Sequence, residues 1–306
     1  MFARILAATD FSAPSDAALA QARHLADSTG ASLHVLHVVD NMFMRAVLAD
    51  PRDYEAAALR QMQDRVSGAI LAVERSDEPA DEITSYARTH DIDLIVMGTH
   101  GRGRMAHLLL GSVAEKVARK APCPVLTMRQ APATSAPEQL RVLVPTDFSP
   151  SSDAAFGVAK RLVARLGGSM CLLHVVEHPA AEPSFGSELC APEAAVVREE
   201  QLAKVRIQLS QRILIDGRSR VKVTSDVIFG PSATTITAYA GDGDFDLIIM
   251  GTRGRGGLAH LLMGSVAESV IRTAACPVLT VKAEAARERA LDEALASVVT
   301  PQAARP

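Results

Sequence analysis

Two segments of the sequence share a glycine pattern that could bind phosphate. Each reads G-x-x-G, then nine residues, then G-S, starting at Gly98 in one segment and at Gly251 in the other. Glycine lets the backbone approach a ligand closely, and Gly-Ser at the start of a helix directs N–H groups and a hydroxyl toward an anion. The pattern therefore predicts phosphate binding, although turns and a helix N-cap would use the same residues. Its members are Gly98, Gly101, Gly111, Ser112, Gly251, Gly254, Gly264 and Ser265.

Two better-known nucleotide motifs do not account for these glycines. Residues 101–106 formally fit the dinucleotide fingerprint G-x-G-x-x-G/A, but that fingerprint follows the first strand of its domain and needs an acidic residue about 20 positions later. Residues 101–106 follow the fourth predicted strand instead. A Walker A loop needs a Gly-Lys pair, which the sequence lacks. Backbone amides rather than a lysine would therefore hold a phosphate.

An aspartate directly precedes a Phe-Ser pair at two further places, Asp10 and Asp147. Each aspartate follows a short apolar run, so its carboxylate is expected at the end of a strand. A carboxylate there could accept hydrogen bonds from both hydroxyls of a ribose. It could instead cap the next helix, a role for which Ser12 and Ser149 compete. Spacing alone leaves both interpretations open.

The sequence contains an internal repeat, which indicates two domains of one fold. The tetrapeptide T-D-F-S occurs at 9–12 and again at 146–149, and 26 of the 36 residues from 93 to 128 are identical to those from 246 to 281. A Pro- and Ala-rich stretch without hydrophobic period separates the copies and is typical of a linker. We therefore predict domains over 1–128 and 141–282, a linker over 129–140 and a tail over 283–306.

Within each domain, short apolar runs alternate with helical patterns. Strands without polar alternation are buried on both faces, as in a parallel sheet covered by helices. In such sheets, ligands bind at the carboxyl ends of strands where the strand order reverses. The second domain is predicted to have strands over 141–145, 170–176, 221–229, 247–250 and 277–281, and helices over 151–166, 192–215, 233–239 and 258–273.

The two domains differ in length around the second helix. His37 and Pro79 lie 42 positions apart, whereas His174 and Pro231 lie 57 apart. The first domain should therefore have a helix shorter by roughly four turns. Its third strand is expected near 69–74, with one side of the sheet less covered.

Composition excludes several classes of function. Lys plus Arg number 32 and Asp plus Glu 35, and without a block of like charges this balance argues against nucleic-acid binding. The sequence has no run of eighteen apolar residues and no signal-peptide pattern at its start, which favours the cytoplasm over a membrane. Four cysteines without a C-x-x-C pair argue against a disulfide framework or a zinc site.

With these motifs assembled, the sequence resembles a tandem pair of universal stress protein (UspA) domains of the ATP-binding subgroup. The resemblance covers 1–128 and 141–282. It is carried by P-T-D-F-S, L-H-V-V, D-L-I-V-M-G-T-H-G-R, the glycine pattern followed by valine, and C-P-V-L. It implies an α/β fold of two tandem doubly wound Rossmann-like domains, each a five-stranded parallel sheet of order 3-2-1-4-5 flanked by helices. It also implies bound ATP, with or without Mg²⁺.

The resemblance assigns roles residue by residue. Asp10 and Asp147 match the ribose-binding aspartate, and Val38 and Val175 match the residue whose backbone meets the adenine edge. The remaining positions lie around the ribose and phosphates: Gly98, Gly101, Gly111, Ser112, Val113, Gly251, Gly254, Gly264, Ser265 and Val266. The first domain departs from the family in having Ala8 where the second has Pro145, and in its shortened helix. Occupancy of the first site is therefore left open.

No recognisable catalytic group accompanies the phosphate pattern. A catalytic base, a lysine finger and an acidic Mg²⁺ cluster are all missing from it, and His37 and His174 fit a structural role better than a catalytic one. We expect a stress-response protein that binds ATP and works as a sensor or adaptor, not as an enzyme. Its expected partners are ATP, its own two domains paired together, a second copy or an unidentified protein. The rival hypotheses are slow ATP hydrolysis or autophosphorylation, and an interaction module without nucleotide.

Overall fold

The computed structural model describes residues 2–41, 50–99, 111–129, 139–177, 191–214, 221–254 and 263–283, except for the side chains of 51 and 191–198. The first domain contains β1 (Arg4–Ala8), α1 (Ala13–Thr29), β2 (Ser32–Asp40), α3 (Pro51–Gln63), β3 (Ile70–Ser76), α4 (Pro79–Thr89), β4 (Leu94–Gly98), α5 (Ser112–Lys120) and β5 (Val125–Met128). The second contains β6 (Leu140–Pro145), α6 (Pro150–Leu166), β7 (Gly168–Val176), α7 (Ala191–Leu214), β8 (Lys222–Phe229), α8 (Ser232–Asp242), β9 (Leu247–Gly251), α9 (Ser265–Thr273) and β10 (Val278–Val281).

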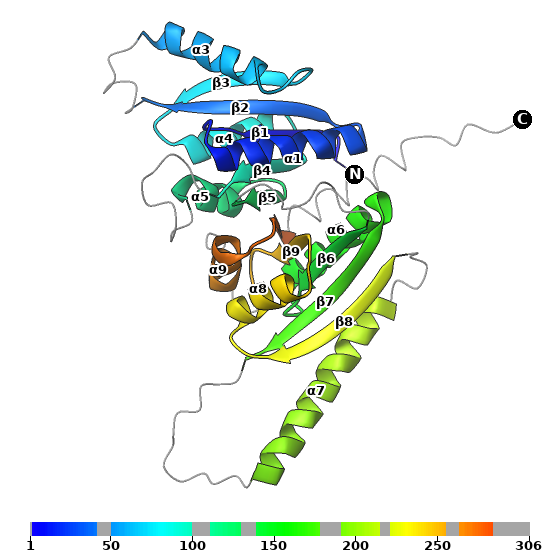
Figure 1. Cartoon of the computed structure of the whole chain (residues 1–306). Coiled ribbons are helices and arrows are strands. Elements are labelled where there is room, and N and C mark those ends of the chain that lie inside the picture. The colour runs from blue at the N-terminus through cyan, green and yellow to red at the C-terminus, as the bar shows by residue number, and fades with distance from the viewer. Residues whose placement is uncertain are drawn as a thin grey trace, which may run out of the picture.

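The described strands form one mostly parallel sheet (Figure 1). Its order is β3-β2-β1-β4-β5-β10-β9-β6-β7-β8. Counted from its own first strand, each domain has the order 3-2-1-4-5, with helices flanking the sheet. The predicted doubly wound α/β fold is confirmed.

The two domains join edge to edge through β5 and β10, which run antiparallel. Two threonines reinforce this seam: Thr127 Oγ1 donates to the carbonyl of Val278 and Thr280 Oγ1 to that of Val125, both at 3.2 Å. Because each domain is parallel internally and the seam is antiparallel, the carboxyl edges of the two domains face opposite ends of the sheet. Any sites at those edges are therefore well separated.

Both faces of the sheet are buried under helices. Ile5 and Leu6 are adjacent on β1 and each is 0% exposed, although their side chains enter different core clusters. One cluster lies under α1 and α6 and spans both domains, since it includes Leu126 of β5 and Leu279 of β10. On the other face, α4 and α5 cover the first domain, and α8 and α9 the second. The seam therefore shares a hydrophobic core as well as backbone hydrogen bonds.

The outer helices differ in length as predicted, but not by the whole difference between the domains. Helix α3 has 13 residues and α7 has 24. Met62 and Leu209 lie near the ends of these helices and are both buried in the shared cluster. The shorter helix still covers the sheet at this point, and the extra length of α7 runs past β8 (Figure 1).

Element boundaries mostly follow the sequence prediction, with one clear error. The strands of the second domain lie within two residues of their predicted bounds. The helix predicted over 258–273 begins only at Ser265, and 258–262 lie outside the described residues. Gly264 is extended (φ −66°, ψ 142°), and its N–H donates to Thr252 O at 2.8 Å. That backbone bond holds Gly264 out of the helix.

Candidate functional site

The second domain has a pocket of about 400 Å³ at the carboxyl ends of its central strands. It lies where β6 pairs with β7 on one side and β9 on the other, the point where the strand order reverses. The sequence-predicted site residues that line it are Asp147, Val175, Gly251, Gly254, Gly264, Ser265 and Val266. All seven positions predicted for this domain therefore surround one cavity.

Several lining residues were not anticipated from the sequence. Leu173, Ile236 and Met250 give the pocket an apolar wall, and Ser232 and Thr252 add hydroxyls. Leu173 and Met250 both belong to continuous apolar runs, so the sequence predicts them as core residues. Nothing in their type indicated that they also border a cavity.

Two helix N-termini flank the pocket, and they differ in electrostatic state. At α8, Glu177 Oε1 accepts a hydrogen bond from the backbone N–H of Ser232 at 3.0 Å. This hydrogen bonding to Ser232 lowers the pKa of the Glu177 carboxyl. At α9, the N-cap is Gly264 and no side-chain hydrogen bond caps the helix. A carboxylate thus already neutralises α8, whereas the first-turn N–H groups of α9 are positioned to receive an anion.

One residue of the pocket lining has an unsatisfied buried hydroxyl. Within the described part of the chain, Thr252 Oγ1 is the buried side-chain oxygen or nitrogen without a hydrogen-bond partner. The corresponding Thr99 Oγ1 of the first domain donates to Met128 O at 3.4 Å. A buried hydroxyl left unpaired is unfavourable. The oxygen itself is buried, so it does not present a donor to a ligand in the pocket as the pocket stands.

The glycines of the pattern have different structural roles. A Cβ on Gly251 would lie 2.7 Å from the backbone carbon of Ser151, so this glycine is required for α6 to approach β9. A Cβ on Gly254 would lie 2.8 Å from Asp147 Oδ2, so its absence lets the loop lie against that carboxylate. A Cβ on Gly264 would meet nothing closer than 3.4 Å. Gly264 therefore leaves space on the pocket side without being needed for packing.

The predicted ribose aspartate sits on a strained turn. Asp147 Oδ1 accepts from the backbone N–H of Ser149 at 3.1 Å, and the intervening Phe148 has a φ of 63°. Ser149 caps α6 by accepting from Ser152 N, and its hydroxyl donates to Arg253 O at 3.2 Å. The cap role proposed as an alternative for the aspartate thus belongs to the serine, and the carboxylate lines the pocket.

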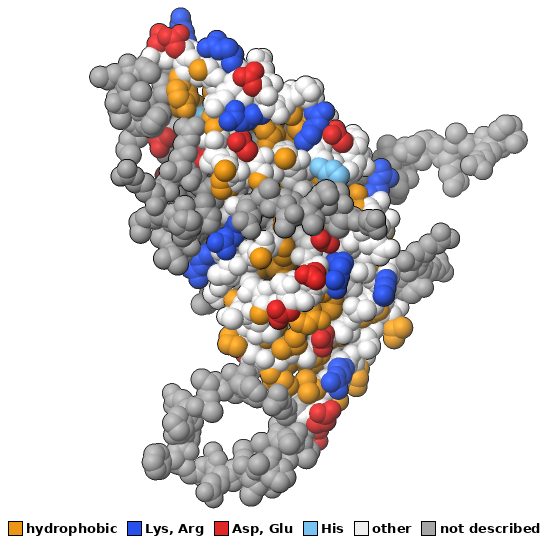
Figure 2. Space-filling view, viewed as in Figure 1, with side chains coloured by type: hydrophobic (Ala, Val, Ile, Leu, Met, Phe, Trp, Pro, Cys, Tyr) orange, Lys and Arg blue, Asp and Glu red, His pale blue; other side chains and the backbone are white. Residues whose placement is uncertain are grey.

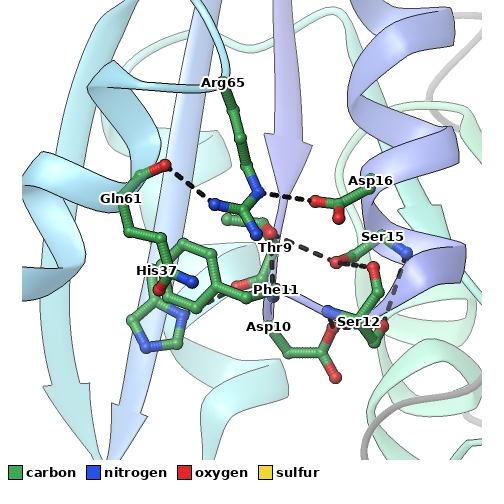
Figure 3. Close-up of polar contacts among 9 residues, drawn as sticks. All are labelled: Thr9, Asp10, Phe11, Ser12, Ser15, Asp16, His37, Gln61 and Arg65. Atoms are coloured by element: carbon green, nitrogen blue, oxygen red, sulfur yellow. Dashed lines mark hydrogen bonds and ion pairs between the residues drawn. The ribbon is translucent and has the colours of Figure 1, made fainter.

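The first domain places the matching residues at the opposite end of the sheet. Asp10 Oδ1 accepts from Ser12 N at 3.1 Å and from Ser12 Oγ at 2.5 Å, and Phe11 has a φ of 64° (Figure 3). Gly111 precedes α5 and donates to Thr99 O at 2.8 Å, as Gly264 does to Thr252. Asp10, Val38, Gly98, Gly111, Ser112 and Val113 thus occupy positions equivalent to those in the second domain. Gly101 lies outside the described residues.

Surface charge and metal-ligand geometry can be described only for the residues with described placement. On the face shown in Figure 2, described acidic and basic side chains are interspersed over both domains. Over the described ranges, no group of three or more His, Cys, Asp or Glu side chains is arranged to hold a metal ion. In the same ranges, none of the helices is both long enough and apolar enough to span a bilayer.

Comparison with known proteins identifies relatives along nearly the whole chain. The universal stress protein family model matches residues 1–129 and 140–282. A universal stress protein of Mycolicibacterium smegmatis is 27% identical over 297 residues, which cover 91% of this chain and 96% of the relative. Three curated mycobacterial universal stress proteins, one from Mycobacterium tuberculosis strain H37Rv, are 31% identical over 204 residues. These three alignments span 63% of this chain and 63% of each relative.

A solved structure shares the fold over the same extent. The crystal structure of a universal stress protein from Archaeoglobus fulgidus superposes with a TM-score of 0.65 and 23% sequence identity. The match covers 92% of this chain and 98% of that chain. The complete tandem arrangement, and not only a single domain, is therefore present in that structure.

Proposed function

The chain belongs to the universal stress protein family, and from this premise we propose that it binds one ATP in each domain and acts as a nucleotide-dependent sensor or adaptor. The observation that carries the proposal is the pocket of the second domain. It combines an aspartate, an apolar wall and a helix N-terminus without a side-chain cap in a cavity of about 400 Å³. This set of groups fits a ligand that is anionic at one end and carries hydroxyls near its middle.

The pocket gives such a ligand a direction. The phosphates would lie at the N-terminus of α9, where the backbone N–H groups and the hydroxyl of Ser265 donate. The carboxylate of Asp147 would accept from the ribose hydroxyls. The base would lie toward Val175 and Ile236, on the side of α8, because the Glu177 carboxylate at the N-terminus of that helix repels the phosphates. These residues bind and orient; Mg²⁺, if it accompanies the nucleotide, would be held by the phosphates.

The proposal can be tested by filling the space that the phosphates need. Gly264→Val is suited to this because Gly264 has an ordinary φ of −66° and no contact under 3.4 Å to a new Cβ. The equivalent Gly111 has a φ of −59°. Isothermal titration with ATP should give about half the binding stoichiometry for Gly264→Val or Gly111→Val alone, and no binding for the double variant.

A matched control is Gly241→Val, because Gly241 lies on α8 with nothing within 4 Å of a new Cβ. It should bind ATP as the unsubstituted chain does. Unchanged affinity in the Gly111→Val/Gly264→Val double variant would overturn the assignment. Absence of ATP binding by the unsubstituted chain would favour an interaction module, and slow release of ADP from bound ATP would favour the hydrolytic alternative.

A further inference from the structure

Beside each predicted ribose aspartate, the structure contains an arginine that the sequence analysis did not single out. Arg65 lies over the ring of Phe11, with its guanidinium carbon 5.4 Å from the ring centroid, and Phe11 in turn lies 4.5 Å from His37, centroid to centroid. Figure 3 shows these three side chains layered next to Asp10. The second domain repeats the arrangement with Arg212, Phe148 and His174, at 4.6 Å for both contacts.

The middle residue of each stack holds an unfavourable backbone conformation. Phe11 and Phe148 have φ values of 64° and 63°, in the left-handed region that bulky residues rarely adopt. Each backbone N–H donates to the threonine two residues earlier, at 3.0 Å for Phe11 and 3.1 Å for Phe148. The histidine of the stack donates through Nδ1 to the carbonyl of the same threonine, at 2.8 Å in the first domain and 2.7 Å in the second.

This strained residue directly follows the aspartate. With its φ positive, the chain turns so that the carboxylate accepts from the serine N–H two residues on, at 3.1 Å in both domains. The direction of the carboxylate therefore depends on the phenylalanine, and the phenylalanine is covered by the arginine. Left-handed strain of this kind persists only where surrounding contacts stabilise it.

The arginine is fixed from a second side by an ion pair to the first helix. Arg65 Nε lies 2.9 Å from Asp16 Oδ1, and Arg212 Nε lies 2.8 Å from Asp153 Oδ1. The side chains of Arg65 and Arg212 are 29% and 25% exposed, so both guanidinium groups are largely covered. Each arginine thus connects the outer helix, the first helix and the turn that carries the aspartate.

The arrangement is kept although the connecting chain has changed length. Phe11 and Phe148 are 137 positions apart, whereas Arg65 and Arg212 are 147 apart, so the second domain has ten more residues between the two stack partners. Seven of those residues lengthen the N-terminal end of α7, and Arg212 lies on α7 whereas Arg65 lies two residues past the end of α3. The buried Met62 and Leu209 are also 147 positions apart, so the same register of the outer segment brings the arginine to the stack in both domains.

We propose that Arg65 and Arg212 are positioning residues that hold Asp10 and Asp147 in the direction needed to accept hydrogen bonds from the ribose hydroxyls of a nucleotide. The proposal rests on the proposed function. Through the stack, the guanidinium keeps the phenylalanine in its left-handed conformation. That turn then fixes the direction of the aspartate carboxylate. The arginines themselves do not contact the ligand.

A double-mutant-type cycle, which combines a protein substitution with removal of the ribose hydroxyls from the ligand, isolates this role. In the full chain carrying Gly111→Val to silence the first site, we would measure the Kd of ATP and of 2′,3′-dideoxy-ATP, which lacks both hydroxyls, with and without Arg212→Ala. ATP binding should weaken by about fivefold or more, whereas dideoxy-ATP binding should weaken by less than about twofold, because coupling appears only between groups that interact. An equal loss for both nucleotides would overturn the proposal.

Two further variants separate positioning from general damage. Arg206→Ala removes an arginine from the same helix that is 62% exposed and 3.7 Å from Glu199, and it should leave both Kd values unchanged. Arg212→Lys keeps a cation near Phe148 and Asp153, and it should restore ATP affinity to within about twofold of the parent. A Lys variant as weak as Arg212→Ala for both nucleotides would contradict the proposal. If the parent itself binds no ATP, the proposed function fails first, and this inference fails with it.

Discussion

The two domains agree at the carboxyl edge of the sheet and differ at the amino edge. At the carboxyl edge, the aspartate turn, the positive-φ phenylalanine and the arginine stack recur, with the guanidinium carbon 5.4 Å from the ring centroid in the first domain and 4.6 Å in the second. At the amino edge, His34 Nδ1 contacts Tyr86 OH at 3.0 Å in the first domain, and Cys171 Sγ contacts Tyr239 OH at 3.7 Å in the second. The carboxyl edge thus keeps its residue types and turn geometry in both domains, whereas the amino edge changes residue types.

The outer helices extend the same comparison. Helix α7 is 11 residues longer than α3, but Leu209 and Met62 remain buried in one cluster and the stack arginines remain in place. Aligned on Met62 and Leu209, seven of the extra residues precede the equivalent of the start of α3 and four follow the equivalent of its end. Helix length therefore varies at both ends, while the buried residue and the stack arginine keep their positions.

The two domains should respond alike to substitution of their strand-end glycines, and this is the largest expected effect on stability. Gly251→Val would bring a Cβ to 2.7 Å from the backbone of Ser151, and Gly98→Val to 3.0 Å from the backbone of Pro14. Each should lower the free energy of unfolding by about 3 kcal/mol, because the helix backbone cannot give way easily.

Urea denaturation of the two variants and of Gly264→Val would measure this. Gly264→Val should stay within about 1 kcal/mol of the parent, since its new side chain has space. If Gly251→Val were as stable as Gly264→Val, the division of the glycines into packing and ligand positions would be wrong.

A smaller effect is expected at the two capping serines. Ser12→Ala and Ser149→Ala each remove a side-chain cap and should each lower the free energy of unfolding by about 1 kcal/mol. They should differ in ligand binding, because Ser149 Oγ donates to Arg253 O in the glycine loop whereas Ser12 Oγ donates to Asp10. Thermal melts with and without ATP would show this. ATP should raise the melting temperature of Ser149→Ala by less than that of the parent, because the glycine loop is held less firmly. An ATP-induced rise as large as that of the parent would contradict this interpretation.

The smallest effect is a change in pH dependence at the amino edge. Burial first, and then the charges of His90 and Arg4, lower the pKa of His34 from its ordinary 6.5. In the unfolded chain His34 keeps the ordinary value and takes up a proton first as the pH falls, so stability declines below about 6.5 until the lowered folded pKa is passed. His34→Cys, which installs the residue of the second domain, should flatten this decline.

The measurement is the free energy of unfolding at pH 7.5 and at pH 5.5 for both proteins, taken as a difference within each protein so that the cavity left by cysteine cancels. Cys171→Ser serves as the control, because it changes the same position of the other domain without adding or removing a histidine. An undiminished pH difference in His34→Cys would show that other groups cause the acid sensitivity.

The sequence was sufficient for the features that rest on local pattern. Continuous apolar runs located the strands, and the position of Asp147 and Gly264 relative to those runs located the pocket, because the carboxyl ends of parallel strands meet at one edge. Identity between the repeats made the two-domain architecture evident.

Features that depend on tertiary contact were not predictable. β5 and β10 are the edge strands of their domains, and they pair antiparallel only once each domain has formed its own sheet. The C-P-V-L motif does not predict this pairing. Arg212 lies 64 positions after Phe148, across a segment of variable length, so no spacing rule connects them. The requirement for Gly251 comes from α6, which the motif does not contain.

The central claim is that each domain holds one ATP, and counting nucleotide on the purified chain tests it most directly. The protein would be denatured, and the released nucleotide identified by chromatography and mass spectrometry and quantified per chain, with ATP added back to any empty fraction. We predict a total of two ATP per chain. No released nucleotide, together with no uptake of added ATP, would contradict the account.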